Sequence, residues 1–189
     1  MINYVTYRKF VTLKNGQRVM FRFLNAQDRE NLLKLFQDAP DEDIRFLKQD
    51  VKDSKLIDYW IDNIDYQKVL PLVAVNMEDN VLIADATLHR GKHATKHVGE
   101  VRIFVSRAYR NQGLGSIMLD ELINLAKLEN LQILKAEVLT EHKGVLKAFK
   151  SKGFDLKCIL DEFFLRKDGM THDVALLIRP VVRREDAEF

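Results

Sequence analysis

The segment from Val105 to Leu119, VSRAYRNQGLGSIML, carries the residue types in this chain that are best suited to binding an anion. Its Arg110, Gly113 and Gly115 have the spacing Arg-x-x-Gly-x-Gly, between an apolar strand pattern and an amphipathic helix pattern. Glycines let the backbone come close to an anion, and the first N–H groups of a helix point at it. The segment therefore predicts a phosphate-binding turn, to which Arg110 adds a charge.

Two common nucleotide motifs do not fit this turn. A dinucleotide fingerprint requires a third glycine where Met118 stands, and a P-loop requires Gly-Lys followed by Ser or Thr. A pyrophosphate held mainly by backbone N–H groups is the remaining interpretation.

Composition indicates one ordinary globular domain. The chain has 189 residues, of which 47% are hydrophobic and 31% charged, which is enough for one core. The net charge of +2, from 30 basic and 28 acidic residues, provides no field that would attract nucleic acid. We expect a single domain over residues 1–180, followed by a charged tail over 181–189.

Targeting signals and cysteine content favour the cytoplasm. We find no signal-peptide pattern at the start, and no apolar run approaches the roughly 18 residues of a membrane span. The single cysteine, Cys158, excludes an internal disulfide and a cysteine-built zinc site. We expect Cys158 to pack inside a strand.

Hydrophobic periodicity predicts a single α/β domain with a mixed sheet. Asn25 is the expected cap of the first helix, and one or two helices are expected within 41–67. The expected strands are 18–23, 69–75, 81–88, 100–105, 132–139, 156–165 and 173–178. Further helices are expected at 113–130 and 142–151.

The turn also resembles the pyrophosphate loop of the GNAT superfamily of acetyl-CoA-dependent N-acyltransferases. Downstream, AEVLTEHKGVLKAFKSKGF matches the strand and helix of that family and ends in Gly153-Phe154. Two positions depart from the family pattern, because His142 replaces an asparagine and Phe149 a tyrosine.

A narrower resemblance, over most of residues 10–165, is to the bacterial Pat-type protein lysine acetyltransferases. It rests on an Arg-Phe pair at 45–46, on Asp65-Tyr66 before a strand, and on Glu100 five positions before Val105. That branch commonly lacks the tyrosine, so Phe149 agrees with it.

The resemblance implies the GNAT fold, a mixed, mostly antiparallel sheet of about seven strands with helices on both faces. It also implies acetyl-CoA as co-substrate, no metal, and direct attack by an amine in a ternary complex. A lysine ammonium has a pKa near 10.4, so a base must take its proton, and Glu100 is the candidate. Backbone N–H groups near Phe104 and Val105 would polarise the thioester carbonyl. The residues implied in cofactor binding are Phe104, Val105, Arg110, Asn111, Gln112, Gly113, Leu114, Gly115, Ser116, His142 and Phe149.

Several residues also have plain structural interpretations. Glu100 would instead pair with Arg102 or Lys135, and Phe149 would belong to the core. His142 would cap its helix. His89, His93 and His97 recur every four residues, but glycines place this stretch in a loop, which disfavours a metal site.

The sequence does not decide which class of amine accepts the acetyl group. Asp58, Asp62 and Asp65 would form either an acidic rim for a cationic amine or a solvated helix face. Three functions are consistent with the sequence. The protein would acetylate a protein lysine, or acetylate a small amine such as a polyamine, amino acid or aminoglycoside, or bind acyl-CoA as a non-catalytic module. The oligomeric state, a homodimer included, is also open.

Overall fold

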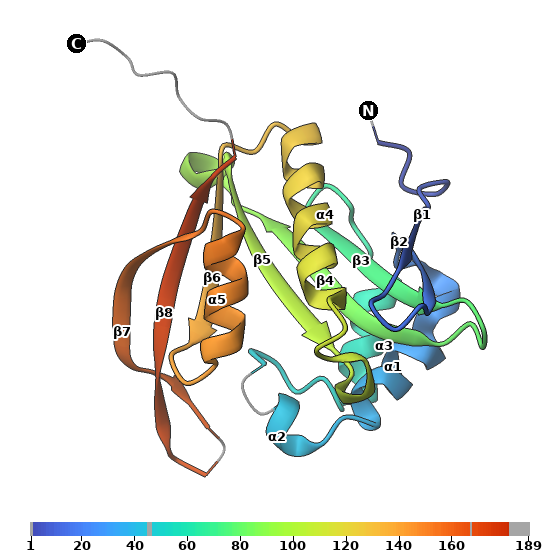
Figure 1. Cartoon of the computed structure of the whole chain (residues 1–189), viewed down its shortest axis with the longest axis horizontal. Coiled ribbons are helices and arrows are strands. Elements are labelled where there is room, and N and C mark those ends of the chain that lie inside the picture. Colours follow the sequence, from blue (N-terminus) through green and yellow to red (C-terminus); the bar gives the residue numbers. More distant parts are fainter. Residues whose placement is uncertain (1, 45–46, 167, 182–189) are drawn as a thin grey trace.

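The computed structural model describes residues 2–44, 47–166 and 168–181 (Figure 1). In that part of the chain one eight-stranded sheet has the order β1-β2-β3-β4-β5-β6-β8-β7, and only β5 and β6 pair in parallel. The mixed, mostly antiparallel sheet is confirmed. The strands are β1 (Lys9–Thr12), β2 (Arg18–Phe23), β3 (Val69–Asn76), β4 (Leu82–Arg90), β5 (Val98–Val105), β6 (Ile133–Leu139), β7 (Asp155–Leu165) and β8 (Thr171–Pro180).

The additional strand is β1, which pairs antiparallel with β2. It is only four residues long, so its periodicity does not stand out in the sequence. Residues 182–189 of the expected tail over 181–189, and the Arg-Phe pair at 45–46, lie outside the described residues.

Helices cover both faces of the sheet (Figure 1). Helices α4 and α5 lie over one face, where Met118 and Leu122 of α4 share a core with Leu88 of β4. Helices α1 and α3 cover the other face, where Phe36 and Ile57 share a core with Phe104 of β5. The helices are α1 (Arg29–Gln37), α2 (Asp41–Ile44), α3 (Ser54–Asp62), α4 (Leu114–Leu128) and α5 (Lys143–Ser151).

The first helical region begins where the sequence predicts. The Asn25 side chain accepts a hydrogen bond from the Gln27 N–H, and Asp28 bonds back to the Asn25 N–H, so that a capping box starts a 3₁₀ turn. Helix α1 continues directly from this turn. The region 41–67 contains two short helices, α2 and α3, as expected.

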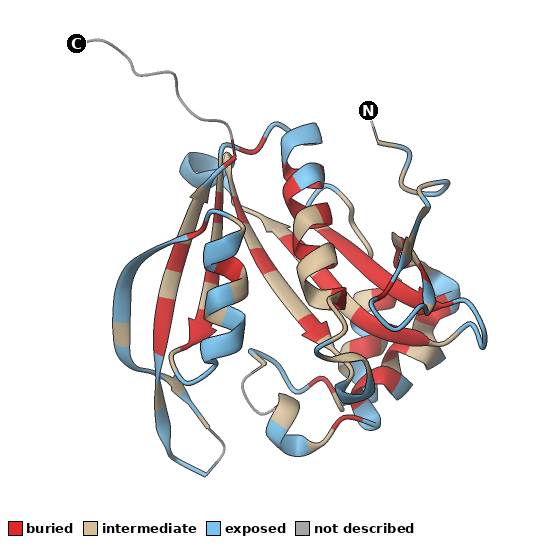
Figure 2. Cartoon of the chain, viewed as in Figure 1, coloured by how far each residue is buried: buried red, intermediate tan, exposed pale blue. Residues whose placement is uncertain are grey.

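Cys158 lies on the surface, contrary to the expectation that it packs inside a strand. Its strand β7 is at the edge of the sheet and pairs only with β8, and most of its residues are exposed (Figure 2). Apolar β7 residues such as Ile159 are exposed as well, so the strand pattern there does not mark a buried face.

The feature of the fold that positions the site is the divergence of β5 and β6. The two strands pair only through Val98 with Ile133, Gly99 with Leu134 and Glu100 with Lys135. Beyond Glu100, β5 has no partner on that side, and Figure 1 shows the two strands separating toward the C-terminal end of β5.

Candidate active site

The predicted phosphate-binding turn forms the N-terminus of α4. Gly113 is the N-cap with φ of 90°, a left-handed conformation that favours glycine, and no side chain caps the helix. The first N–H groups of a helix have no acceptor within the helix, and here they also lack a side-chain acceptor. This helix end therefore presents N–H donors and the positive end of a dipole to an anion.

Lys14 lies beside the turn, although it stands about a hundred residues before the motif in the sequence. Its backbone N–H donates to the Gln112 carbonyl over 3.3 Å, and a Cβ built on Gly113 would lie 3.6 Å from Lys14 Cε. The ammonium group thus belongs to the surroundings of the turn, where a phosphate would find a cation. No local signal in the sequence connects Lys14 with the motif.

The side chain of Gln112 has a buried acceptor, Oε1, without a hydrogen-bond partner among the described residues. Its Nε2, by contrast, donates to the Ala108 carbonyl over 3.0 Å. Buried acceptors of this kind are normally satisfied. Together with the uncapped helix end, this atom fits a turn that binds the pyrophosphate and neighbouring groups of acetyl-CoA.

Arg110 is engaged within the protein. Its Nε donates to the Val105 carbonyl over 3.0 Å and its Nη1 to Asp43 Oδ1 over 2.9 Å. Asp43 also accepts bonds from Arg107, and these hydrogen bonds bring the pKa of Asp43 down to about 2. Arg110 therefore ties the turn to β5 and α2, and its contact with a cofactor stays a prediction.

At the end of β5, Val105 is the residue whose amide faces the diverging strands. The Ser106 N–H bonds to the Ile83 carbonyl of β4 over 3.0 Å, and successive amides of a strand point to opposite sides. The Phe104 amide accordingly points to β4 and the Val105 amide toward β6, where β5 is unpaired. The geometry therefore favours Val105 over Phe104 as a donor to a bound carbonyl.

Glu100, the candidate base, lies in a network of cations. Its Oε1 is 2.8 Å from Lys48 Nζ and 2.7 Å from Arg102 Nε, and its Oε2 is 3.1 Å from Lys135 Nζ. Burial raises the pKa of Glu100, but hydrogen bonds from Lys48 and Arg102 outweigh it and bring the pKa to about 2. Both structural partners considered from the sequence, Arg102 and Lys135, are present, and Lys48 is a third.

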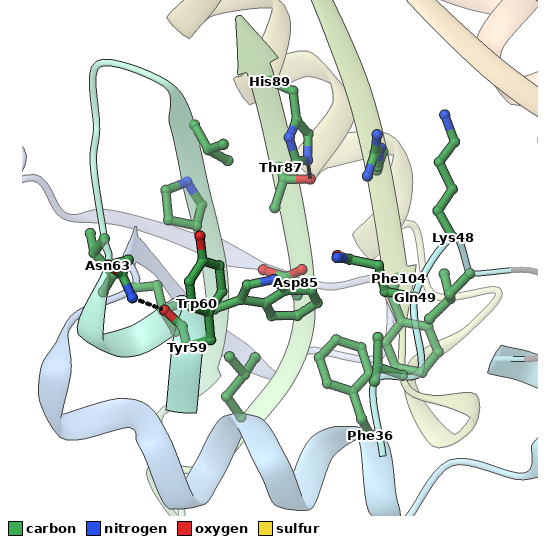
Figure 3. A pocket seen from close by; sticks show the side chains of 18 of the residues that line it. Phe36, Lys48, Gln49, Tyr59, Trp60, Asn63, Asp85, Thr87, His89 and Phe104 are labelled. Carbon is green, nitrogen blue, oxygen red and sulfur yellow. Dashed lines mark hydrogen bonds between the residues drawn. The ribbon is translucent and has the colours of Figure 1, made fainter. Parts of the chain in front are cut away.

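A second carboxylate, Asp85, lies deeper on the same face of the sheet. It projects from β4 into a cavity of about 660 Å³ between the sheet and the segment that contains α1 and α3. Figure 3 shows its carboxyl group in the middle of the cavity, with Trp60 of α3 on one side and Phe104 of β5 on the other. Burial raises the pKa of Asp85 to about 7.

Sequence reasoning missed Asp85. It stands in the apolar run VLIADATL, which by its pattern predicts only a strand. The available signal was an acidic residue at an alternating position of an otherwise apolar strand.

His142 lies at the start of helix α5 and Phe149 within it. His142 is exposed at the N-cap of α5 and makes no capping hydrogen bond, so it does not cap the helix. Phe149 is 6% exposed and packs edge-on against Phe154 with ring centroids 5.0 Å apart. This packing agrees with the expectation that Phe149 belongs to the core. Cofactor contacts of both residues stay predictions.

The three acidic residues within and just after α3 are already paired. Asp58 and Asp62 form ion pairs with Arg29, and Asp65 lies 2.8 Å from Lys68. This pairing supports the solvated helix face rather than an acidic rim. Within residues 2–44, 47–166 and 168–181, no three His, Cys, Asp or Glu side chains group as metal ligands, and no helix is long and apolar enough to cross a membrane.

Comparison with known proteins identifies the family of this chain. The model of the acetyltransferase (GNAT) family matches residues 30–154, and the chain belongs to this family. The family uses acetyl-CoA as acetyl donor.

Solved structures share the fold at low identity. The GNAT domain of S. lividans PAT is 21% identical with a TM-score of 0.74, and the match covers 92% of this chain and 96% of that one. The ribosomal-protein-S5-alanine acetyltransferase of Vibrio fischeri is 12% identical with a TM-score of 0.77, over 89% and 96%. The yncA protein of Salmonella typhimurium, solved with its cofactor acetyl-CoA, is 16% identical with a TM-score of 0.75, over 90% and 98%.

Proposed function

We propose that the protein transfers the acetyl group of acetyl-CoA to the side-chain amine of a protein lysine. The observation that carries this proposal is the position of Lys48. Its Nζ lies 2.8 Å from Glu100 and 2.9 Å from Glu137, beside the point where β5 and β6 diverge. Two carboxylates at this place thus accommodate a lysine ammonium.

The residues of the turn would hold the cofactor. The N–H groups at the start of α4 and the Lys14 ammonium would bind its phosphates, and the Val105 amide would polarise its thioester carbonyl. Acetyl-CoA supplies an activated acetyl group. The leaving group is the thiolate of coenzyme A, which is tolerable because the pKa of its thiol is near that of a free thiol, about 8.5. Direct attack by the acceptor amine then requires no acyl-enzyme.

Glu100 is suited to holding an ammonium group. With a pKa of about 2 it stays ionised at neutral pH. For Glu100 to take a proton, an acceptor would first have to displace Lys48 from it.

A small-molecule amine is the second candidate acceptor. It is favoured by the cavity around Asp85, because a partly enclosed space of about 660 Å³ with aromatic walls suits a small ligand. Fold and cofactor turn do not choose between the two acceptors.

The test is to incubate the protein with labelled acetyl-CoA and a desalted cell lysate, and in parallel with the separated small-molecule fraction. We expect label in discrete protein bands, at lysine side chains, and less of it with Glu100→Gln. Label confined to small molecules would overturn the lysine proposal in favour of the second candidate. Label in neither fraction, with acetyl-CoA still bound, would indicate a binding module without turnover.

A further inference from the structure

The aromatic cavity beneath α1 and α3 contains a carboxyl group, that of Asp85, to which no other described residue bonds. Asp85 is half-buried there and makes no side-chain hydrogen bond or ion pair within the described residues. A carboxylate that is partly removed from water and has no partner destabilises the fold, and such groups persist mainly where a ligand uses them.

The charged side chains that line the cavity, apart from Asp85, are paired, and its histidine is hydrogen-bonded. Lys48 and Arg102 both bond to Glu100. Asp65 and Lys68 pair with each other at 2.8 Å. His89 Nε2 lies 2.9 Å from Thr87 Oγ1, and burial lowers the pKa of His89 to about 4, so it is neutral at pH 7.

The walls of the cavity suit a hydrocarbon chain with a cationic end. Phe36 from α1, Trp60 from α3 and Phe104 from β5 line the space around Asp85 (Figure 3). Apolar walls favour methylene groups, and aromatic faces also attract an ammonium group.

We propose that this cavity binds the acceptor as a primary alkylammonium ion, with Asp85 as its counter-ion. The inference rests on the proposed function and deepens it, because it names Asp85, rather than the carboxylates around Lys48, as the residue that recognises the ammonium group of the acceptor. An unbranched chain next to the charge, as in a lysine side chain or a polyamine, matches the combination of apolar walls and one half-buried acid.

The position of Asp85 also connects it with the reaction. In the β4–β5 register Asp85 lies directly opposite Phe104, next to Val105 at the open end of β5. Asp85 would take one proton from the bound ammonium, which frees the nitrogen lone pair. The C–N bond then forms at the thioester carbonyl, the C–S bond breaks, and the second proton leaves with the collapse of the tetrahedral intermediate to the thiolate or to water.

The inference has a test that needs no turnover. Trp60 is the only tryptophan of the chain and lines the cavity, so its fluorescence reports occupancy directly. We would titrate the full-length protein with n-butylammonium chloride and, separately, with n-butanol, which has a similar chain and no charge. We expect a saturable change with butylammonium at pH 8, and affinity at least tenfold weaker for butanol.

Variants separate the charge of Asp85 from its contribution to the fold. Asp85→Asn is expected to weaken butylammonium binding at least tenfold, whereas Asp85→Glu retains most of it. Asp79→Asn, at an exposed carboxylate in the β3–β4 turn, is the matched control and should bind as wild type does. Circular dichroism of each variant checks that the fold is kept.

The pH dependence is a further readout. Since the counter-ion must be ionised, butylammonium affinity should rise about tenfold from pH 6 to pH 8 in the wild type and stay flat in Asp85→Asn. Equal affinity for butanol, unchanged binding in Asp85→Asn, or no saturable signal would overturn the inference. Acetyl-CoA binding, measured by calorimetry on the same samples, would separate such a failure from a failure of the proposed function.

Discussion

Lys48 Nζ lies 2.8 Å from Glu100 Oε1, so a lysine of the chain itself contacts the carboxylate expected to act as the base. Arg102 and Lys135 complete the surroundings of that carboxylate. By contrast, Asp85 on the neighbouring strand contacts no cation among the described residues. The two carboxyl groups of this face thus have opposite pKa shifts, to about 2 for Glu100 and about 7 for Asp85.

Removal of Lys48 should raise the pKa of Glu100. Lys48→Ala deletes one of the hydrogen bonds that lower this pKa, while the burial that raises it remains. Carboxyl ¹³C NMR titration of labelled protein, with Glu100→Gln for assignment, measures the shift. Lys52→Ala is the matched control, because Lys52 pairs with Asp41 in the same segment. An unchanged titration in Lys48→Ala would contradict the network.

Glu100→Gln should destabilise the protein at neutral pH. The folded pKa of about 2 lies below the unfolded value, so the ionised Glu100 contributes stability above about pH 4.3, which is lost as pH falls toward 2. We expect a loss of about 1–3 kcal/mol in the free energy of unfolding at pH 7. Urea denaturation at pH 7 and pH 3 checks this, and an equal loss at both pH values would argue against the ion pairs as its cause.

Asp85→Asn should have the opposite effect. The folded pKa of about 7 lies above the unfolded value near 3.9, so ionisation of Asp85 costs stability as pH rises through this window. The variant avoids this cost, and we expect it to exceed the wild type by about 2–4 kcal/mol at pH 8 and to match it at pH 4. Urea denaturation at the two pH values measures the difference. A variant that is less stable at pH 8 would show that the carboxylate is compensated inside the fold.

Gly113→Ala should weaken acetyl-CoA binding. At φ of 90° a Cβ is strained by about 1–2 kcal/mol even in open space, so the turn would shift and its N–H groups would move from the phosphates. Calorimetric titration should show at least a tenfold increase in Kd. Gly144→Ala, in α5 with open space around it, is the matched control and should leave Kd unchanged. Undiminished affinity for acetyl-CoA in Gly113→Ala would place the cofactor elsewhere. The same result in Gly113→Asp, which adds a negative charge at the turn, would be stronger evidence for this.

The sequence by itself determined the features that depend on local signals. The alternating apolar runs, the Asn25 cap and the glycine turn at Gly113 each act over a few neighbouring residues, and the structure has them where the sequence predicts. The short strand β1 and the exposure of Cys158 were missed, because sheet pairing and edge position depend on distant parts of the chain.

The tertiary structure alone decided the electrostatics of the site. Glu100 and Asp85 are both acidic residues on predicted strands, and of the three cations around Glu100 only Arg102 is close to it in sequence. Lys48 reaches Glu100 from 52 residues away, whereas burial beneath α1 and α3 leaves Asp85 without a cation. A pKa depends on the charges and the water around a group in space, and folding brings these together from segments that are remote in sequence.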